Sequence, residues 1–234
     1  MSRRLILFDI DGTLIAPGPI PRALFGQALS QVLGREISLS FNDVAGATDP
    51  TIAAAVLRRE GMADGQLARG VQQVLDWYAP RVAEQLPGSG TVTVHGGAEA
   101  LVHGCLARGW DVALLTGNLP GGAKAKLADT GLWDLFSFGI FGDEGNSRVD
   151  LPPLAREKAW DRLGKVYHAH ETILVGDTPA DAQVARLAGM RSLVVCRRDE
   201  PQWREAILAE EPTWLVDNFE DTEQLLNTLE EENT

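Results

Sequence analysis

The sequence predicts an α/β protein with a doubly wound parallel sheet and a small inserted helical domain. Three observations predict this: short apolar runs, segments with helical spacing between them, and one long stretch that has helical patterns only. Alternation of strands and helices is typical of a parallel sheet whose crossover helices cover both faces. A stretch without strands inside this alternation indicates a helical insertion.

Four short apolar runs have the length and composition of strands that are buried on both faces. They are residues 5–8, 112–115, 173–175 and 192–195. Three further segments have apolar residues at i, i+3 and i+4, which is the spacing of a helix with one buried face. They are residues 97–108, 122–130 and 180–188. Gly189 ends the last of these, as glycine commonly does just past a helix.

Residues 20–85 contain helical patterns alone, over 21–33, 50–60 and 66–84. Linkers rich in proline and glycine enter this region at residues 16–19 and leave it at residues 87–90, where hinges are expected. We therefore expect residues 1–16 and 88–234 to form the α/β core, and residues 17–87 to form the helical domain. A chain of 234 residues is long enough for both units.

The composition is that of a folded protein, with 44% hydrophobic and 23% charged residues. The formal net charge of −12 disfavours binding to nucleic acid, because polyanions are repelled and no basic face is evident. Much of the acidity lies in residues 220–232, which we interpret as a solvated helix or a fraying tail.

The two cysteines, Cys105 and Cys196, lie far apart and lack metal-ligand spacing, so we expect buried reduced thiols. The apolar stretch at residues 5–8 is too short for a signal peptide or a membrane span. A cytoplasmic protein without membrane contact is therefore expected, as a monomer or a homodimer.

Polar residues follow three of the predicted strands. They are Asp-Ile-Asp-Gly-Thr at residues 9–13, Thr-Gly-Asn at 116–118 and Gly-Asp-Thr-Pro-Ala-Asp at 176–181. Ligands of open parallel sheets bind outside the carboxyl ends of the strands, so these residues are expected around one pocket. Four carboxylates crowded together would raise each other's pKa unless a cation neutralised them. Oxygen ligands alone select a hard ion, which predicts Mg²⁺.

In these motifs the chain resembles the haloacid dehalogenase-like hydrolases. Their first motif has the form Asp-x-Asp-Gly-Thr after an apolar strand, and residues 9–13 match it. Residues 116–118 resemble the second motif and residues 176–181 the fourth, in the same order along the chain. The resemblance implies a Rossmann-like core, and the inserted helices stand where many relatives have a cap over the active site.

The resemblance implies that Asp9 is a nucleophile that forms an aspartyl-phosphate, and that Asp11 is the general acid and base. Members that cleave carbon–halogen bonds lack the second aspartate, so Asp11 favours phosphoryl transfer. The resemblance also implies that Asp177 binds Mg²⁺ with Asp9 and the main-chain carbonyl of Asp11. Asp181 would be a further ligand or would orient the site.

Thr116, Gly117 and Asn118 are expected to bind the phosphate oxygens. The family also has a phosphate-neutralising lysine, usually in a Lys-Pro pair, and no such pair precedes the fourth motif here. Lys126 and Lys158 are the two candidates, and we favour Lys126 because some relatives have the basic residue on the helix after the second motif.

Residues 46–49, Gly-Ala-Thr-Asp, resemble a cap loop of phosphoglycolate phosphatase-like members, so Thr48 and Asp49 are candidates for substrate selection. The alternative is that Thr48 merely caps the following helix. The four histidines lack metal-ligand spacing and are expected at the surface or behind the site; they are His95, His103, His168 and His170.

These observations predict a Mg²⁺-dependent phosphatase for a small phosphorylated metabolite such as phosphoglycolate or a sugar phosphate. A phosphomutase or phosphonate hydrolase of the same fold is an alternative. A binding protein that has kept the fold without catalysis is another.

Overall fold

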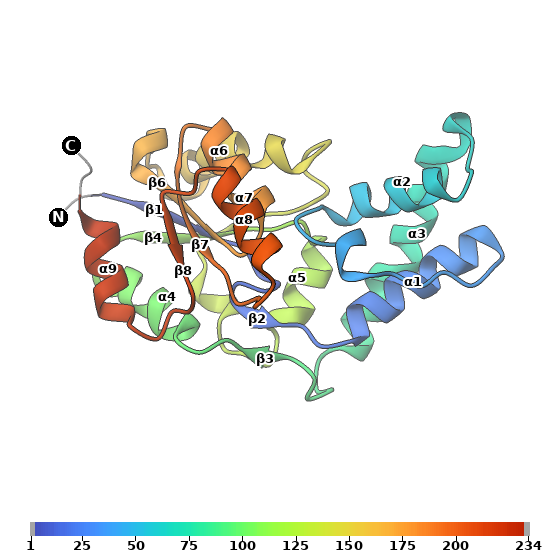
Figure 1. Ribbon diagram of the computed structural model, residues 1–234, viewed down its shortest axis with the longest axis horizontal. Helices are drawn as coiled ribbons and strands as arrows, with labels where there is room; N and C mark the ends of the chain where they lie inside the picture. The colour runs from blue at the N-terminus through green and yellow to red at the C-terminus, as the bar shows by residue number, and fades with distance from the viewer. Residues whose placement is uncertain (1–2, 232–234) are drawn as a thin grey trace.

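The structure, a computed structural model, describes residues 3–231 of the chain. Over this range six parallel strands form the central sheet, in the order β5-β4-β1-β6-β7-β8 (Figure 1). In that order they are Gly139–Ile140, Asp111–Leu115, Leu5–Phe8, Thr172–Gly176, Arg191–Val195 and Trp214–Val216. The central position of β1 explains its sequence, because all four of its side chains are fully buried.

Alternate residues of β1 pack on opposite faces of the sheet. Ile6 and Phe8 belong to the apolar layer under α4 (Ala98–Ala107), α5 (Pro120–Leu127) and α9 (Thr222–Glu230). Leu5 and Leu7 belong to the layer under α6 (Leu151–Leu163) and α7 (Pro179–Leu187). At the edge of the sheet, α8 (Pro201–Ala209) packs against α7.

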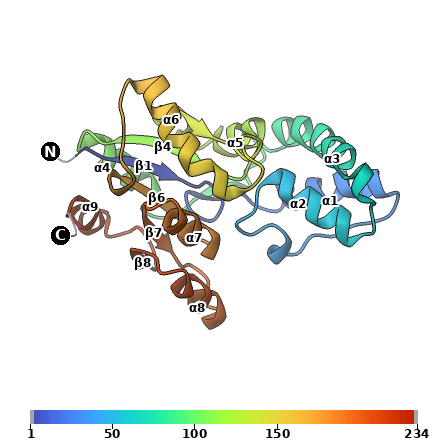
Figure 2. The ribbon, with the colours of Figure 1, turned by 90° about the horizontal axis from the view of Figure 1, so that it is seen from above.

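The helical insertion consists of α1 (Ile20–Leu33), α2 (Asp49–Arg59) and α3 (Asp64–Gln85), which lie beyond the carboxyl ends of the strands (Figures 1 and 2). The chain enters and leaves it through a short antiparallel ribbon of β2 (Ile15–Ala16) and β3 (Thr93–Val94).

The insertion has its own cluster of buried apolar side chains, which includes Phe25 and Tyr78 with ring centroids 4.7 Å apart. Leu119 and Ala125, at and in α5, belong to this second cluster as well. Other residues of α5, Ala123 and Leu127, belong to the layer under the sheet. The helix α5 therefore contacts both cores.

The predicted fold class is confirmed, and the four predicted strands are β1, β4, β6 and β7. The strands β5 and β8 were not predicted, because they are two and three residues long and lie at the edges of the sheet. The helices α6 and α8 were not predicted either. The helix expected at 122–130 begins at Pro120 and ends at Leu127, with proline in the first turn, where its missing N–H costs nothing.

The acidic C-terminal region forms α9, which buries Leu226 and Leu229 against the sheet layer and is therefore not a wholly solvated helix. The alternative of a fraying tail over residues 220–232 is wrong for Thr222–Glu230, which are helical, and residue 232 lies outside the described range. Both cysteines are free and buried, as expected.

None of the helices between residues 3 and 231 has the length and hydrophobicity that a membrane span requires. The described part of the chain also contains four short 3₁₀ helices: Phe41–Asp43, Trp133–Leu135, Arg148–Asp150 and Ala169–Glu171.

Candidate active site

The loop after β1 places Asp9 at the carboxyl edge of the sheet, where its amide donates to the carbonyl of Val175 at 2.9 Å. Gly12 turns this loop with a φ of 79°, a conformation that favours glycine. A Cβ on Gly12 would lie 2.1 Å from Oδ2 of Asp177, so there is also no room for a side chain. Thr13 Oγ1 donates to Asp177 Oδ1 at 3.2 Å and joins the loop to the end of β6.

Three carboxylates meet at these strand ends. Asp9, Asp177 and Asp181 each offer an oxygen, and these oxygens all lie within 4.8 Å of one another. Burial raises the pKa of Asp9 to about 6. Burial, with the neighbouring Asp181 and Asp9, raises the pKa of Asp177 well above its usual value. The three carboxylates therefore have more negative charge than the surrounding groups neutralise, which is typical of a site that binds a cation.

Asp181 has a different environment from the other two acids. Its Oδ2 accepts from the amides of Asp177 and Thr178 at 3.2 and 3.0 Å and from the Thr178 hydroxyl at 2.7 Å. Thr178 is also the N-cap of α7. Asp181 therefore fixes the turn that presents Asp177, while Asp9 and Asp177 have free oxygens for a cation.

Arg148, in the 3₁₀ helix before α6, is a site residue that the sequence analysis missed. Its Nη2 lies 3.2 Å from Asp9 Oδ2 and also pairs with Asp181 Oδ1. The side chain is buried, and its Nε has no hydrogen-bond partner within the described residues. The available signal was a basic residue in the segment where the family's Lys-Pro pair was sought, inside the capping pattern Ser-x-x-Asp at residues 147–150.

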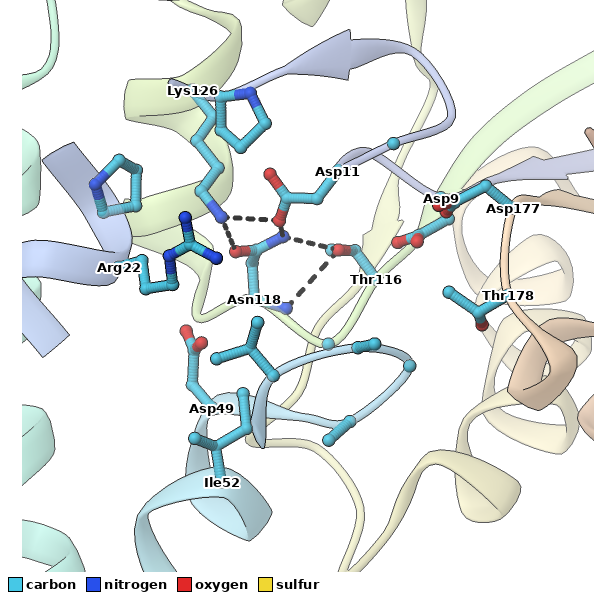
Figure 3. A pocket seen from close by; sticks show the side chains of 18 of the residues that line it. Asp9, Asp11, Arg22, Asp49, Ile52, Thr116, Asn118, Lys126, Asp177 and Thr178 are labelled. Carbon is cyan, nitrogen blue, oxygen red and sulfur yellow. Dashed lines mark hydrogen bonds and ion pairs between the residues drawn. The ribbon is translucent and has the colours of Figure 1, made fainter. Parts of the chain in front are cut away.

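On the other side of the pocket, Asn118 and Lys126 hold Asp11 (Figure 3). Asn118 Nδ2 donates to Asp11 Oδ2 at 2.8 Å and to Thr116 Oγ1 at 2.7 Å. Lys126 Nζ donates to the same Asp11 oxygen at 2.5 Å and to Asn118 Oδ1. The second oxygen of Asp11, Oδ1, is buried without a partner within residues 3–231.

The two candidate lysines are placed differently. Lys126 is 5% exposed and lines the pocket. Lys158 pairs with Glu144 at 2.5 Å, donates to the carbonyl of Gly139 at 3.0 Å and is not among the pocket-lining residues. The structure therefore brings Lys126, and not Lys158, together with the two loops.

The helical insertion touches the loop after β4 through Asp49. The Asp49 amide donates to the carbonyl of Gly117, and Asp49 Oδ2 accepts from the amide of Leu119, both at 2.8 Å. This contact is possible because Gly117 has no side chain. A Cβ at this position would lie 2.1 Å from the carbonyl oxygen of Ala47. Burial raises the pKa of Asp49 to about 6. Thr48 is fully buried as the N-cap of α2 and does not line the pocket, whereas Asp49 does.

A cavity of about 340 Å³ lies between the core and the insertion. Its apolar wall comes from the insertion and includes Phe25, Phe41, Val44 and Ile52. His95 also lines it and is half-buried, so it is a wall residue rather than a surface histidine. Burial, with the nearby Arg197, lowers the pKa of His95 to about 4, which makes the ring neutral at pH 7.

Comparison with known proteins identifies the family of the chain. A family model described as haloacid dehalogenase-like hydrolase matches residues 3–189. A phosphoglycolate phosphatase of Cereibacter sphaeroides is 29% identical over 80% of this chain and 82% of its own length. A probable phosphatase, IndB, of Dickeya dadantii is 30% identical over 92% of this chain and 90% of its own length.

Solved structures share the fold at lower identity. The structure of CbbY from Rhodobacter sphaeroides in complex with phosphate has a TM-score of 0.69 at 19% identity, over 93% of this chain and 95% of that one. A predicted phosphatase from Clostridium acetobutylicum has a TM-score of 0.71 at 18% identity, over 96% of this chain and 98% of that one. The chain belongs to the haloacid dehalogenase-like hydrolases.

Proposed function

We propose that the chain is a Mg²⁺-dependent phosphatase that hydrolyses small phosphomonoesters through an aspartyl-phosphate on Asp9. One observation supports this above all: Asp9 and Asp177 face a cavity that also contains Asp11, with a free oxygen, and the buried cation Arg148. The names of the curated relatives, phosphoglycolate phosphatase and probable phosphatase, agree with it.

The residues present fit a magnesium ion. The donors are all oxygen atoms, two of the carboxylates have raised pKa values, and they lie close together at the end of the sheet. Asp9, Asp177 and the main-chain carbonyl of Asp11 would hold the ion, while Asp181 would keep Asp177 in place. When bound, Mg²⁺ would neutralise the acids and the phosphoryl oxygens.

Asp9 and Asp11 divide the chemistry between them. A carboxylate oxygen of Asp9 forms a bond to phosphorus while the bond from phosphorus to the ester oxygen breaks. Asp11 gives that oxygen a proton and then takes one from the water that attacks phosphorus, while the bond from Asp9 to phosphorus breaks and inorganic phosphate leaves. Its free Oδ1 is available for this proton, since Lys126 and Asn118 both hold Oδ2.

The phosphate-binding groups follow from the same geometry. Arg148 would neutralise the phosphoryl group, because it contacts Asp9 directly and has an unpaired Nε. Thr116 and the Gly117 amide would bind phosphoryl oxygens. Lys126 would mainly pair with Asp11, whereas the sequence led us to expect a lysine that neutralises the phosphate. Asn118 would position Asp11 in the same network.

The helical insertion, residues 17–87, would act as a cap domain on a core of residues 1–16 and 88–234. Its apolar wall would exclude water from Asp9. A cavity of about 340 Å³ admits a small metabolite and excludes a nucleic acid or a folded protein.

Phosphate release from p-nitrophenyl phosphate in the presence of Mg²⁺ tests the proposal. Asp9→Asn should lower the rate to background, because an amide is not a nucleophile toward phosphorus. The exposed Asp64, on α3 and 94% exposed, supplies the control variant Asp64→Asn, which should keep the wild-type rate. Retained turnover in Asp9→Asn would refute Asp9 as the nucleophile.

A further inference from the structure

We infer that the substrate has a second anionic group besides the phosphate ester, and that Arg22 of the helical insertion binds it. This inference rests on the proposed phosphatase function and specifies the substrate class. It concerns the end of the cavity opposite the metal-binding acids, where Arg22 enters from α1 (Figure 3).

Arg22 is the cation in this cavity that has no acidic partner within the described residues. The other two cations are paired: Lys126 with Asp11, and Arg148 with Asp9 and Asp181. No hydrogen bond or ion pair joins Arg22 to any residue between 3 and 231, although it lines the cavity. In Figure 3 its guanidinium points toward Asn118 and Lys126, which lie beside the phosphate-binding loop.

The local structure of α1 does not account for an arginine at this position. Arg22 lies in the first turn of the helix, which contains no acidic residue, and the N-cap Pro19 makes no side-chain cap hydrogen bond. A cation in a first turn is disfavoured by the helix dipole. Arg22 is exposed to solvent where it lines the cavity, so its unpaired charge is accessible to an anion that enters there.

The two candidates that the sequence suggested for substrate selection are already occupied. Thr48 caps α2, and Asp49 accepts from the Leu119 amide. Asp49 is also negatively charged at neutral pH and would repel an anion. Tyr78 of the insertion also lines the cavity, but it is uncharged, so among the described residues of the insertion Arg22 is the cavity-lining group with a positive charge to bind an anion.

A guanidinium binds carboxylate and phosphate equally through two parallel hydrogen bonds, so the shared chemistry is a planar or tetrahedral oxyanion. A carboxylate and a second phosphate are both compatible with this. One solved structure that shares the fold, a mutant of CbbY from Rhodobacter sphaeroides, is described in complex with xylulose-1,5-bisphosphate, which contains two phosphates. Two pairs of substrates distinguish a carboxylate from a second phosphate as the bound anion.

The first pair is 2-phosphoglycolate and 2-hydroxyethyl phosphate, which differ in the carboxylate. The second is propane-1,3-diyl bisphosphate and 3-hydroxypropyl phosphate, which have the same primary phosphate ester and differ in one phosphate. The full-length enzyme with Mg²⁺ should show a kcat/KM roughly 10- to 100-fold higher for the doubly anionic member of at least one pair, as expected for a hydrogen bond to a charged group. The pair with the larger ratio identifies the anion.

Arg22→Ala should bring that ratio close to one, and Arg22→Lys should restore part of it, because lysine keeps the charge but not the paired donors. Arg69→Ala is the matched control, since Arg69 is an exposed arginine on α3 that does not line the cavity. It should keep the wild-type ratio.

Equal kcat/KM within both pairs for the wild type would overturn the inference. So would an Arg22→Ala variant that loses both members of a pair to the same extent. Failure to hydrolyse any ester, p-nitrophenyl phosphate included, would instead count against the proposed phosphatase function.

Discussion

Gly12 lies at the contact between the loop after β1 and the loop after β6. It has a positive φ, and it lies so close to the carboxylate of Asp177 that no space remains for a methyl group. The spacing between the proposed nucleophile and the proposed metal ligand therefore depends on a residue that takes no part in the chemistry.

Replacing Gly12 by alanine should cost both stability and activity. Left-handed strain and the steric conflict with Asp177 together should lower the free energy of unfolding by about 2 to 4 kcal/mol. Displacement of Asp177 should also abolish turnover of p-nitrophenyl phosphate. Urea denaturation and a phosphate-release assay measure the two effects.

Gly34 is the control for this substitution, because it has a φ of 68° and a Cβ added to it would meet no atom within 4 Å. Gly34→Ala should lose only the strain contribution, about 1 kcal/mol, and keep its activity. Equal destabilisation of the two variants would show that the contact with Asp177 is unimportant.

At the scale of elements, the N-terminus of α2 is hydrogen-bonded to the loop after β4. Asp49 donates through its amide to Gly117 and accepts through its carboxylate from Leu119. A buried carboxylate at this junction is costly once it is ionised, because burial raises its pKa to about 6 from 3.8.

Stability should therefore depend on pH through Asp49. The folded protein binds the proton of the Asp49 carboxyl group more tightly than the unfolded chain does. The contribution of this proton to the free energy of unfolding is therefore full below pH 3.8 and is lost as the pH rises through about 6. Asp49→Asn keeps an oxygen acceptor for Leu119 and removes the charge. Its unfolding free energy relative to wild type should rise by about 2 to 3 kcal/mol between pH 4 and pH 7.

Urea denaturation at the two pH values, without Mg²⁺, measures this difference. The exposed-site variant Asp64→Asn is the control and should show a nearly constant difference from wild type. A constant difference for Asp49→Asn as well would mean that its carboxylate is not desolvated in the folded protein.

The sequence allowed prediction of the elements that are buried on both faces, since the continuous apolar runs of β1 and β6 have few other interpretations. It did not allow prediction of β5, where Gly139 and Ile140 pair only with the end of β4 and form no recognisable run. The acidic strand ends were predictable because they directly follow strands. Arg148 was not, because its role depends on the fold bringing a 3₁₀ helix against Asp9.

At the scale of the molecule, the two apolar cores share one helix. Leu119 and Ala125 pack in the insertion, whereas Ala123 and Leu127 pack under the sheet. Lys126 lies between these two sets on the same helix, so the cation that holds Asp11 is anchored by both cores. We expect the proposed cap and core to respond together to a ligand that binds the strand ends.

Mg²⁺ should raise the melting temperature of the whole protein. A ligand that binds only the folded state stabilises it by about 2.7 kcal/mol at a concentration 100 times its Kd. A calorimetric or fluorescence melt with and without Mg²⁺ measures the shift. Asp177→Asn should remove most of it, because the amide is a weaker and uncharged ligand. A shift that persists in Asp177→Asn would place the ion elsewhere.

The close approach at Gly117 also limits how this enzyme can be altered by protein engineering. Its main chain lies against that of Ala47, and a Cβ on the neighbouring Gly142 would lie 2.0 Å from the Gly117 carbonyl oxygen. Randomised libraries that vary either glycine should yield few folded clones. Diversity directed at Arg22, Phe25 and Ile52 leaves that backbone junction intact and samples new selectivities.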